Sequence, residues 1–77
     1  MIGKFAELVE RELASARAYH GKVTGAHDGY GRILEEVDEF WDEVKKKKCL
    51  RNPHRMRDEL VQIAAMAQRT AEDLELL

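Results

Sequence analysis

Three stretches of this 77-residue chain repeat their apolar residues every three or four positions, which is the period of an α-helix. We place these stretches at about residues 2–20, 28–48 and 53–74. The connections between them are short, and short connections favour helices that pack against their neighbours in sequence. The pattern therefore predicts an all-α fold, with a three-helix bundle unit that forms a single domain over residues 1–77.

Start and stop signals sharpen these boundaries. Gly21 stands where a residue just past a helix end would lie, and Asp28 is the expected N-cap of the second helix. Asn52 and Pro53 combine an N-cap residue with proline at the first helical position, which predicts a sharp start for the third helix. The lysines at 45–48 would then complement the helix dipole in the last turn of the second helix.

The charge balance excludes several classes of protein. With 15 Asp and Glu against 13 Lys and Arg, the chain lacks the basic excess of a dedicated nucleic-acid binder. No apolar run is long enough for a membrane span, and the first residues have no signal-peptide core, so neither membrane insertion nor export is expected. The single cysteine, Cys49, suits a reducing compartment. We therefore expect a cytoplasmic protein.

Small size predicts self-association. A single core in a chain of about this length gives little net stability, and neither a disulfide framework nor a zinc motif is available to compensate. We therefore expect the helical unit to form an oligomer.

The acidic residues are concentrated on the second predicted helix, which holds Asp28, Glu35, Glu36, Asp38, Glu39, Asp42 and Glu43. Four of them, Glu35, Glu36, Glu39 and Glu43, project onto one sector about 100° wide. Like charges at these helical spacings cost about 0.2–0.5 kcal/mol per pair, and a hard cation such as Mg²⁺ or Mn²⁺ would relieve the repulsion. The alternative is a solvated acidic face, paired with Arg32 or the lysine run.

Glu59 on the third predicted helix helps to distinguish a metal site from a solvated acidic face. It lies at the margin of the apolar face, and a carboxylate at a helix seam needs a partner or a metal. If the second and third helices pack antiparallel, Glu59 can face Glu36 and Glu39. The alternative for Glu59 is an ion pair with Arg55 or a lysine.

These residues also resemble a known signature. The segment Glu35-Glu36-Val37-Asp38-Glu39 matches a Glu-Glu-x-x-Glu motif, and Asp58-Glu59-Leu60-Val61-Gln62 resembles the Glu-x-x-Asp motif that follows it on the next helix. Together they are similar to the MazG-like, all-α nucleoside triphosphate pyrophosphohydrolases, over roughly residues 24–74.

The resemblance implies a bundle completed by dimers or tetramers, and metal-dependent hydrolysis of a nucleoside triphosphate to the monophosphate and pyrophosphate. It implies that Glu36, Glu39 and Glu59 bind Mg²⁺ or Mn²⁺, and that Glu35 is a catalytic residue that serves either as a further ligand or to orient water. A metal ion at such a site would neutralise charge on the phosphates and generate a nucleophilic water.

The chain departs from the signature at one position. Gln62 stands where the family has its final Asp, and a neutral amide oxygen adds no charge to a metal site. A non-catalytic oligomerisation or nucleotide-binding module of the same fold is therefore the alternative function.

The roles of four other features are not decided by the sequence. The lysine run is either a phosphate-attracting patch or a solvated helix end. Lys22, Arg32, Arg55 and Arg57 are candidate phosphate contacts. Trp41 either packs in a core or interface or stacks on a base. Glu12, inside the first apolar stripe, either lies at an edge or faces the seam near the metal site.

Overall fold

The computed structural model describes residues 3–77, and these residues form helices without any strand. The elements are α1 (Lys4–Tyr19), α2 (Ala26–Val44), the short 3-10 helix η1 (Lys48–Leu50) and α3 (Pro53–Asp73). The all-α expectation is therefore confirmed. Ile2, which we placed at the start of the first helix, lies outside the described residues.

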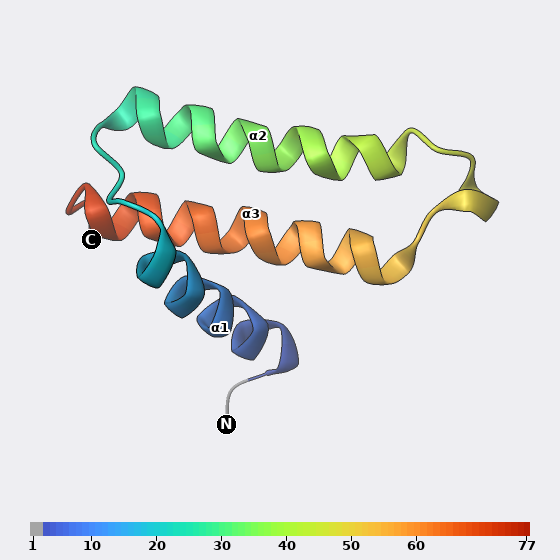
Figure 1. Cartoon of the computed structure of the whole chain (residues 1–77), viewed down its shortest axis with the longest axis horizontal. Helices are drawn as coiled ribbons and strands as arrows, with labels where there is room; N and C mark the ends of the chain where they lie inside the picture. The colour runs from blue at the N-terminus through green and yellow to red at the C-terminus, as the bar shows by residue number, and fades with distance from the viewer. Residues whose placement is uncertain (1–2) are drawn as a thin grey trace.

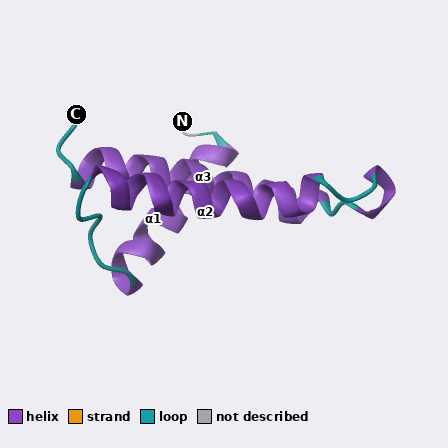
Figure 2. Cartoon of the chain, turned by 90° about the horizontal axis from the view of Figure 1, so that it is seen from above, coloured by secondary structure: helices purple, strands orange, loops and turns teal. Residues whose placement is uncertain are grey.

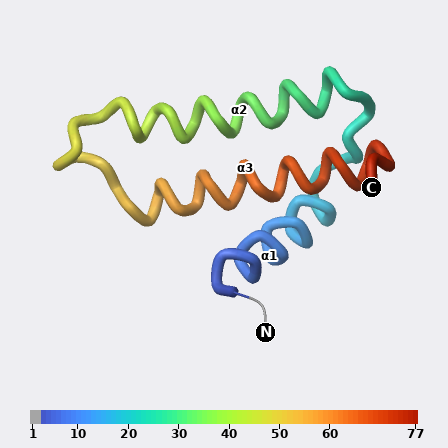
Figure 3. Tube along the Cα trace, turned by 180° about the vertical axis from the view of Figure 1, so that it is seen from behind, coloured from blue at the N-terminus to red at the C-terminus, as the bar shows by residue number. Residues whose placement is uncertain are grey.

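α2 and α3 run antiparallel side by side, and α1 crosses α3 obliquely (Figure 1). The view from behind gives the same arrangement, with the C-terminal end of α3 beside the connection between α1 and α2 (Figure 3). Seen from above, η1 lies beyond the paired helices, at the far end of the α2–α3 hairpin (Figure 2). α3 is therefore the central element, because it packs against both of the other helices.

The apolar core lies between α1 and α3. It consists of Val9, Leu13, Val61 and Ala65, with Leu8 and Ala64 packed against it. The helical period of the sequence predicts that Leu60 and Ala67 lie on the buried stripe of the third helix, and this prediction was wrong, because Leu60 is 42% exposed and Ala67 is exposed. The reason is that α3 divides its surface between two partners, so no single stripe is buried.

The connection from α1 to α2 is tied to the end of α3. Asp73 accepts hydrogen bonds from the backbone N–H of Val23 at 2.9 Å and from Arg17 at 2.8 Å. Gly29 of α2 approaches α3 closely, since a Cβ atom there would lie 2.6 Å from Cγ2 of Thr70. These contacts fix the end of the bundle at which the helices converge.

The structure corrects two boundaries at this end. α1 ends at Tyr19, and His20 leaves it in an extended conformation, so Gly21 does not act as a left-handed stop. α2 begins at Ala26 with Gly25 as the N-cap, so the prediction that Asp28 caps the helix was wrong. Asp28 instead lies in the first turn and accepts a hydrogen bond from the backbone N–H of Thr24 at 2.9 Å.

The predicted end of the second helix was also wrong. α2 ends at Val44, and the lysine run lies in the turn and in η1 rather than in the last helical turn. Arg51 satisfies this helix end, because its Nε donates to the carbonyl of Val44 at 2.9 Å. The start of α3 is confirmed: Asn52 caps the helix by accepting from the backbone N–H groups of His54 and Arg55, and Pro53 follows it.

Candidate metal centre

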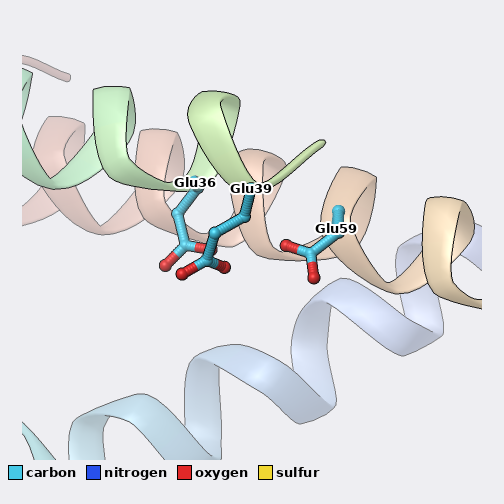
Figure 4. A group of neighbouring side chains, drawn as sticks. All are labelled: Glu36, Glu39 and Glu59. Atoms are coloured by element: carbon cyan, nitrogen blue, oxygen red, sulfur yellow. The ribbon is translucent and has the colours of Figure 1, made fainter. Parts of the chain in front are cut away.

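Three glutamates from two helices meet on one side of the α2–α3 hairpin. Glu36 and Glu39 lie on α2, one turn apart, and Glu59 lies on α3. Each offers a carboxylate oxygen, and the three oxygens lie within 4.8 Å of one another. Figure 4 shows the three side chains pointing into the same space, toward α1. The antiparallel packing of α2 and α3 thus brings together the three residues that the sequence singled out as ligands.

No described basic side chain forms an ion pair with this group, although the charge of Arg55 acts on Glu59. The ion pairs among residues 3–77 leave out Glu36, Glu39 and Glu59. Arg55, the alternative partner of Glu59, lies 3.8 Å from Glu43 instead. One carboxylate oxygen of Glu59 is buried and has no hydrogen-bond partner. A buried polar atom without a partner costs about 1–3 kcal/mol, and either a proton or a cation would satisfy this oxygen.

The crowding of carboxylates changes their acidity. Burial, followed by the charges of Glu39, Glu59 and Glu12, raises the pKa of Glu36 to about 7. Burial and the nearby carboxylate of Glu39 also raise the pKa of Glu59. Both glutamates are therefore easier to protonate than an ordinary glutamate, and a cation would compete with the proton for the same oxygens.

The geometry fits a small divalent cation. Mg²⁺ holds oxygen ligands at about 2.1 Å, so two ligands on opposite sides of the ion are about 4.2 Å apart. The three oxygens lie within 4.8 Å of one another, so at most small rotations of the glutamate side chains would bring them to one ion. Hard oxygen ligands of this kind suit Mg²⁺ or Mn²⁺.

Glu35, the predicted catalytic residue, lies outside this group of three. It is exposed and lines a cavity of about 480 Å³ that Glu36 and Gln62 also line. Glu12 of α1 lines the same cavity and is half-buried, so it faces the seam near the three glutamates rather than a free edge. The cavity therefore places Glu35, Gln62 and Glu12 next to the candidate metal centre.

Glu43, the fourth member of the predicted acidic sector, has a different role. Its side chain is buried and accepts hydrogen bonds from the backbone N–H of Asn52 at 2.6 Å and from Lys46 at 2.9 Å. The Lys46 hydrogen bond and the Asn52 N–H lower the pKa of Glu43. Glu43 therefore ties the end of α2 to the start of α3 and is not available to a metal.

One charged residue of this cavity was not predicted from the sequence. Arg69 of α3 is 4% exposed and lines the cavity together with Arg32. Arg69 stands between the polar residues Gln68 and Thr70, which gives no sign of burial, and its hydrogen bond to Gly21 shows that the connection between α1 and α2 covers it. Trp41, by contrast, is 57% exposed, so it does not pack in the core of the single chain.

Comparison with known proteins gives no family assignment: no protein-family model, no curated protein and no solved structure matches this chain. Among residues 3–77, no helix combines the length and the apolar character needed to cross a membrane. The case for a function therefore depends on the fold and on the geometry of the site.

Proposed function

We propose that this chain is a MazG-like, metal-dependent nucleoside triphosphate pyrophosphohydrolase that produces a nucleoside monophosphate and pyrophosphate. The observation that carries the proposal is the convergence of Glu36, Glu39 and Glu59, unpaired by any described cation and with a buried oxygen of Glu59 left without a partner. The order of these residues on two antiparallel helices agrees with the signature that the sequence resembles.

Glu36, Glu39 and Glu59 would hold Mg²⁺ or Mn²⁺. The bound ion would supply charge neutralisation at the phosphates and lower the pKa of a water molecule. The packing of α2 against α3 would hold the three carboxylates near one another before the metal binds, despite their mutual repulsion. The cost of this crowding in the metal-free chain would be recovered when the ion binds.

Glu35 would act on the attacking water. Its exposed carboxylate lies beside Glu36 in sequence and is outside the group of three, so it remains free to accept a proton. The water oxygen would form the new bond to phosphorus, the bridging P–O bond would break, and the proton would pass to Glu35. The products would be the nucleoside monophosphate and pyrophosphate.

We also propose that the working form is a homodimer or homotetramer. Tyr30, Leu34, Val37 and Trp41 form a stripe on α2 that is between 40% and 67% exposed. Such a stripe on a small helical protein supports burial against another copy of the chain. The nucleotide substrate and the single exposed cysteine, Cys49, fit action in the cytoplasm.

Gln62 favours a second candidate function. It lines the cavity where the related signature has an acidic residue, so the site carries one negative charge fewer. The same fold would then bind nucleotide or assemble without turnover.

Release of pyrophosphate separates the two candidates. The wild-type chain is incubated with each nucleoside triphosphate and Mg²⁺ or Mn²⁺, alongside Glu39→Gln and the matched control Asp38→Asn. Asp38 is exposed on the same helix and lies outside the group of three. The enzyme is supported if the wild type and Asp38→Asn release pyrophosphate and Glu39→Gln does not. Nucleotide binding without turnover supports the module.

A further inference from the structure

Two arginines from different helices meet at one carbonyl oxygen inside the cavity. Arg69 of α3 donates to the backbone oxygen of Gly21 at 2.8 Å, and Arg32 of α2 donates to the same oxygen at 3.1 Å. Both arginines line the cavity of about 480 Å³. A single carbonyl therefore holds two guanidinium groups close together, although their charges repel each other.

Arg69 is a buried cation whose charge interacts with that of Asp73 without forming an ion pair. It is 4% exposed, and none of the ion pairs in the described part of the chain involves it. Its Nε is buried and has no hydrogen-bond partner. Arginine is almost never buried without a partner, because removing its charge from water is costly. An anion in the cavity would give Arg69 the direct ion-pair partner that it lacks among the described residues.

The two arginines differ in how their charges are balanced. Arg32 forms an ion pair with Asp28 at 3.0 Å, whereas Arg69 has no ion-pair partner among residues 3–77. The other acidic residues that line the cavity, Glu12, Glu35 and Glu36, would repel an anion. Glu36 follows Arg32 by one turn of α2, so the cavity has a basic end and an acidic end.

We propose that Arg32 and Arg69 form a binding site for a phosphate-type oxyanion at the basic end of this cavity. The planar fork of N–H groups on arginine matches the oxygens of phosphate, which makes arginine suited to this ligand. The site is separate from the three glutamates, and its ligand is the anion rather than the cation. In the proposed enzyme, Arg32 and Arg69 would bind the substrate phosphates that extend away from the metal, and this further role rests on the proposed function.

Inorganic pyrophosphate tests the site directly. The full ¹⁵N-labelled chain is titrated with pyrophosphate in EDTA at constant ionic strength, and backbone and arginine Nε–H resonances are followed by NMR. We expect saturable shifts at the Nε–H of Arg69 and at Gly21. Shifts confined to the lysines at 45–48, or no saturable shift in the cavity, would overturn the proposal.

Three variants locate the binding. Arg32→Gln and Arg69→Met should each weaken pyrophosphate binding roughly tenfold or more, because each loses a charge-assisted hydrogen bond. Arg11→Gln removes the same charge from an exposed position on α1 that does not line this cavity, and should bind like the wild type. Equal affinity in all three variants and the wild type would overturn the site.

Folding is checked by circular dichroism. If Arg69→Met loses its helices, the affinity of Arg32→Gln and the Arg69 signal of the wild-type chain decide the question. Because the titration contains no metal, its result is independent of turnover. If the chain binds pyrophosphate but does not hydrolyse nucleoside triphosphates, the anion site stands and the proposed enzyme is rejected. If it hydrolyses nucleoside triphosphates but does not bind pyrophosphate at the arginines, the enzyme stands and the anion site is rejected.

Discussion

The carboxylates of Glu36 on α2 and Glu59 on α3 approach within 4.8 Å, and no described ion pair involves either of them. Like charges brought together at a helix seam destabilise the fold that holds them unless a proton or a cation intervenes. The bundle therefore carries a local cost at this point, and functional sites commonly carry such a cost.

Removing one of these charges should stabilise the metal-free chain. We expect Glu59→Gln to raise the melting temperature in EDTA by roughly 5 °C, which corresponds to about 1 kcal/mol for a domain of this size. Differential scanning calorimetry at pH 8 measures the change, with Asp38→Asn as the control on an exposed position. A lower melting temperature for Glu59→Gln than for the wild type would mean that the carboxylate contributes to stability.

Stability should depend on pH with a defined sign. Burial and neighbouring carboxylates raise the pKa of Glu36 from 4.5 to about 7, so between these values the folded chain binds more protons than the unfolded chain. The free energy of unfolding in EDTA should therefore fall as the pH rises from about 5 to 8. The raised pKa of Glu59 acts in the same direction.

Other carboxylates limit this effect on the acid side. Hydrogen bonds and ion pairs lower the pKa values of Asp28, Glu43, Glu72 and Asp73, so their contribution is lost as the pH falls below their usual range. Thermal unfolding in EDTA from pH 3 to 8 should thus give a maximum near pH 5. The decline toward pH 8 should be smaller in Glu36→Gln, and an unchanged decline in that variant would contradict the assignment to Glu36.

The close approach of α2 and α3 should be sensitive to a single methyl group. In Gly29→Ala, the new Cβ would lie 2.6 Å from Cγ2 of Thr70, and the clash should lower the free energy of unfolding by about 1–3 kcal/mol. Gly31→Ala is the matched control, because a Cβ there meets nothing within 4 Å and should stabilise the helix by up to about 1 kcal/mol. Urea unfolding compares them, and equal effects would contradict the packing described for Gly29.

The exposed stripe on α2 should control assembly. We expect the wild-type chain to sediment as a dimer or tetramer at micromolar concentration, and Trp41→Ser to sediment as a smaller species. Tyr19→Ser is the control, because Tyr19 is 82% exposed on α1, outside the stripe. A wild-type monomer would contradict the proposed oligomer, and equal assembly of Trp41→Ser would place the interface elsewhere.

The helices and the meeting of the three glutamates follow from local signals. Periodic apolar residues and the Asn52–Pro53 start are properties of short segments, so they could be predicted without knowing the tertiary structure. The convergence of Glu36, Glu39 and Glu59 required only one further assumption, that neighbouring helices with a short connection pack antiparallel. The metal that we assign to these residues stays a prediction.

The remaining features depend on contacts between distant segments. Glu43 has the same helical spacing as its neighbours, and only its hydrogen bond to Asn52 assigns it to the turn rather than to the site. The burial of Arg69 depends on a connection 48 residues earlier in the chain. The sequence of α3 alone therefore could not reveal the basic end of the cavity.

Binding of Mn²⁺, followed by the loss of the free-ion signal in electron paramagnetic resonance, tests the central claim most directly. We predict saturable binding by the wild-type chain at pH 8 and by Asp38→Asn, with affinity reduced at least about tenfold in Glu36→Gln and Glu59→Gln. Equal Mn²⁺ binding by the wild type and all three variants would contradict a metal site at Glu36, Glu39 and Glu59.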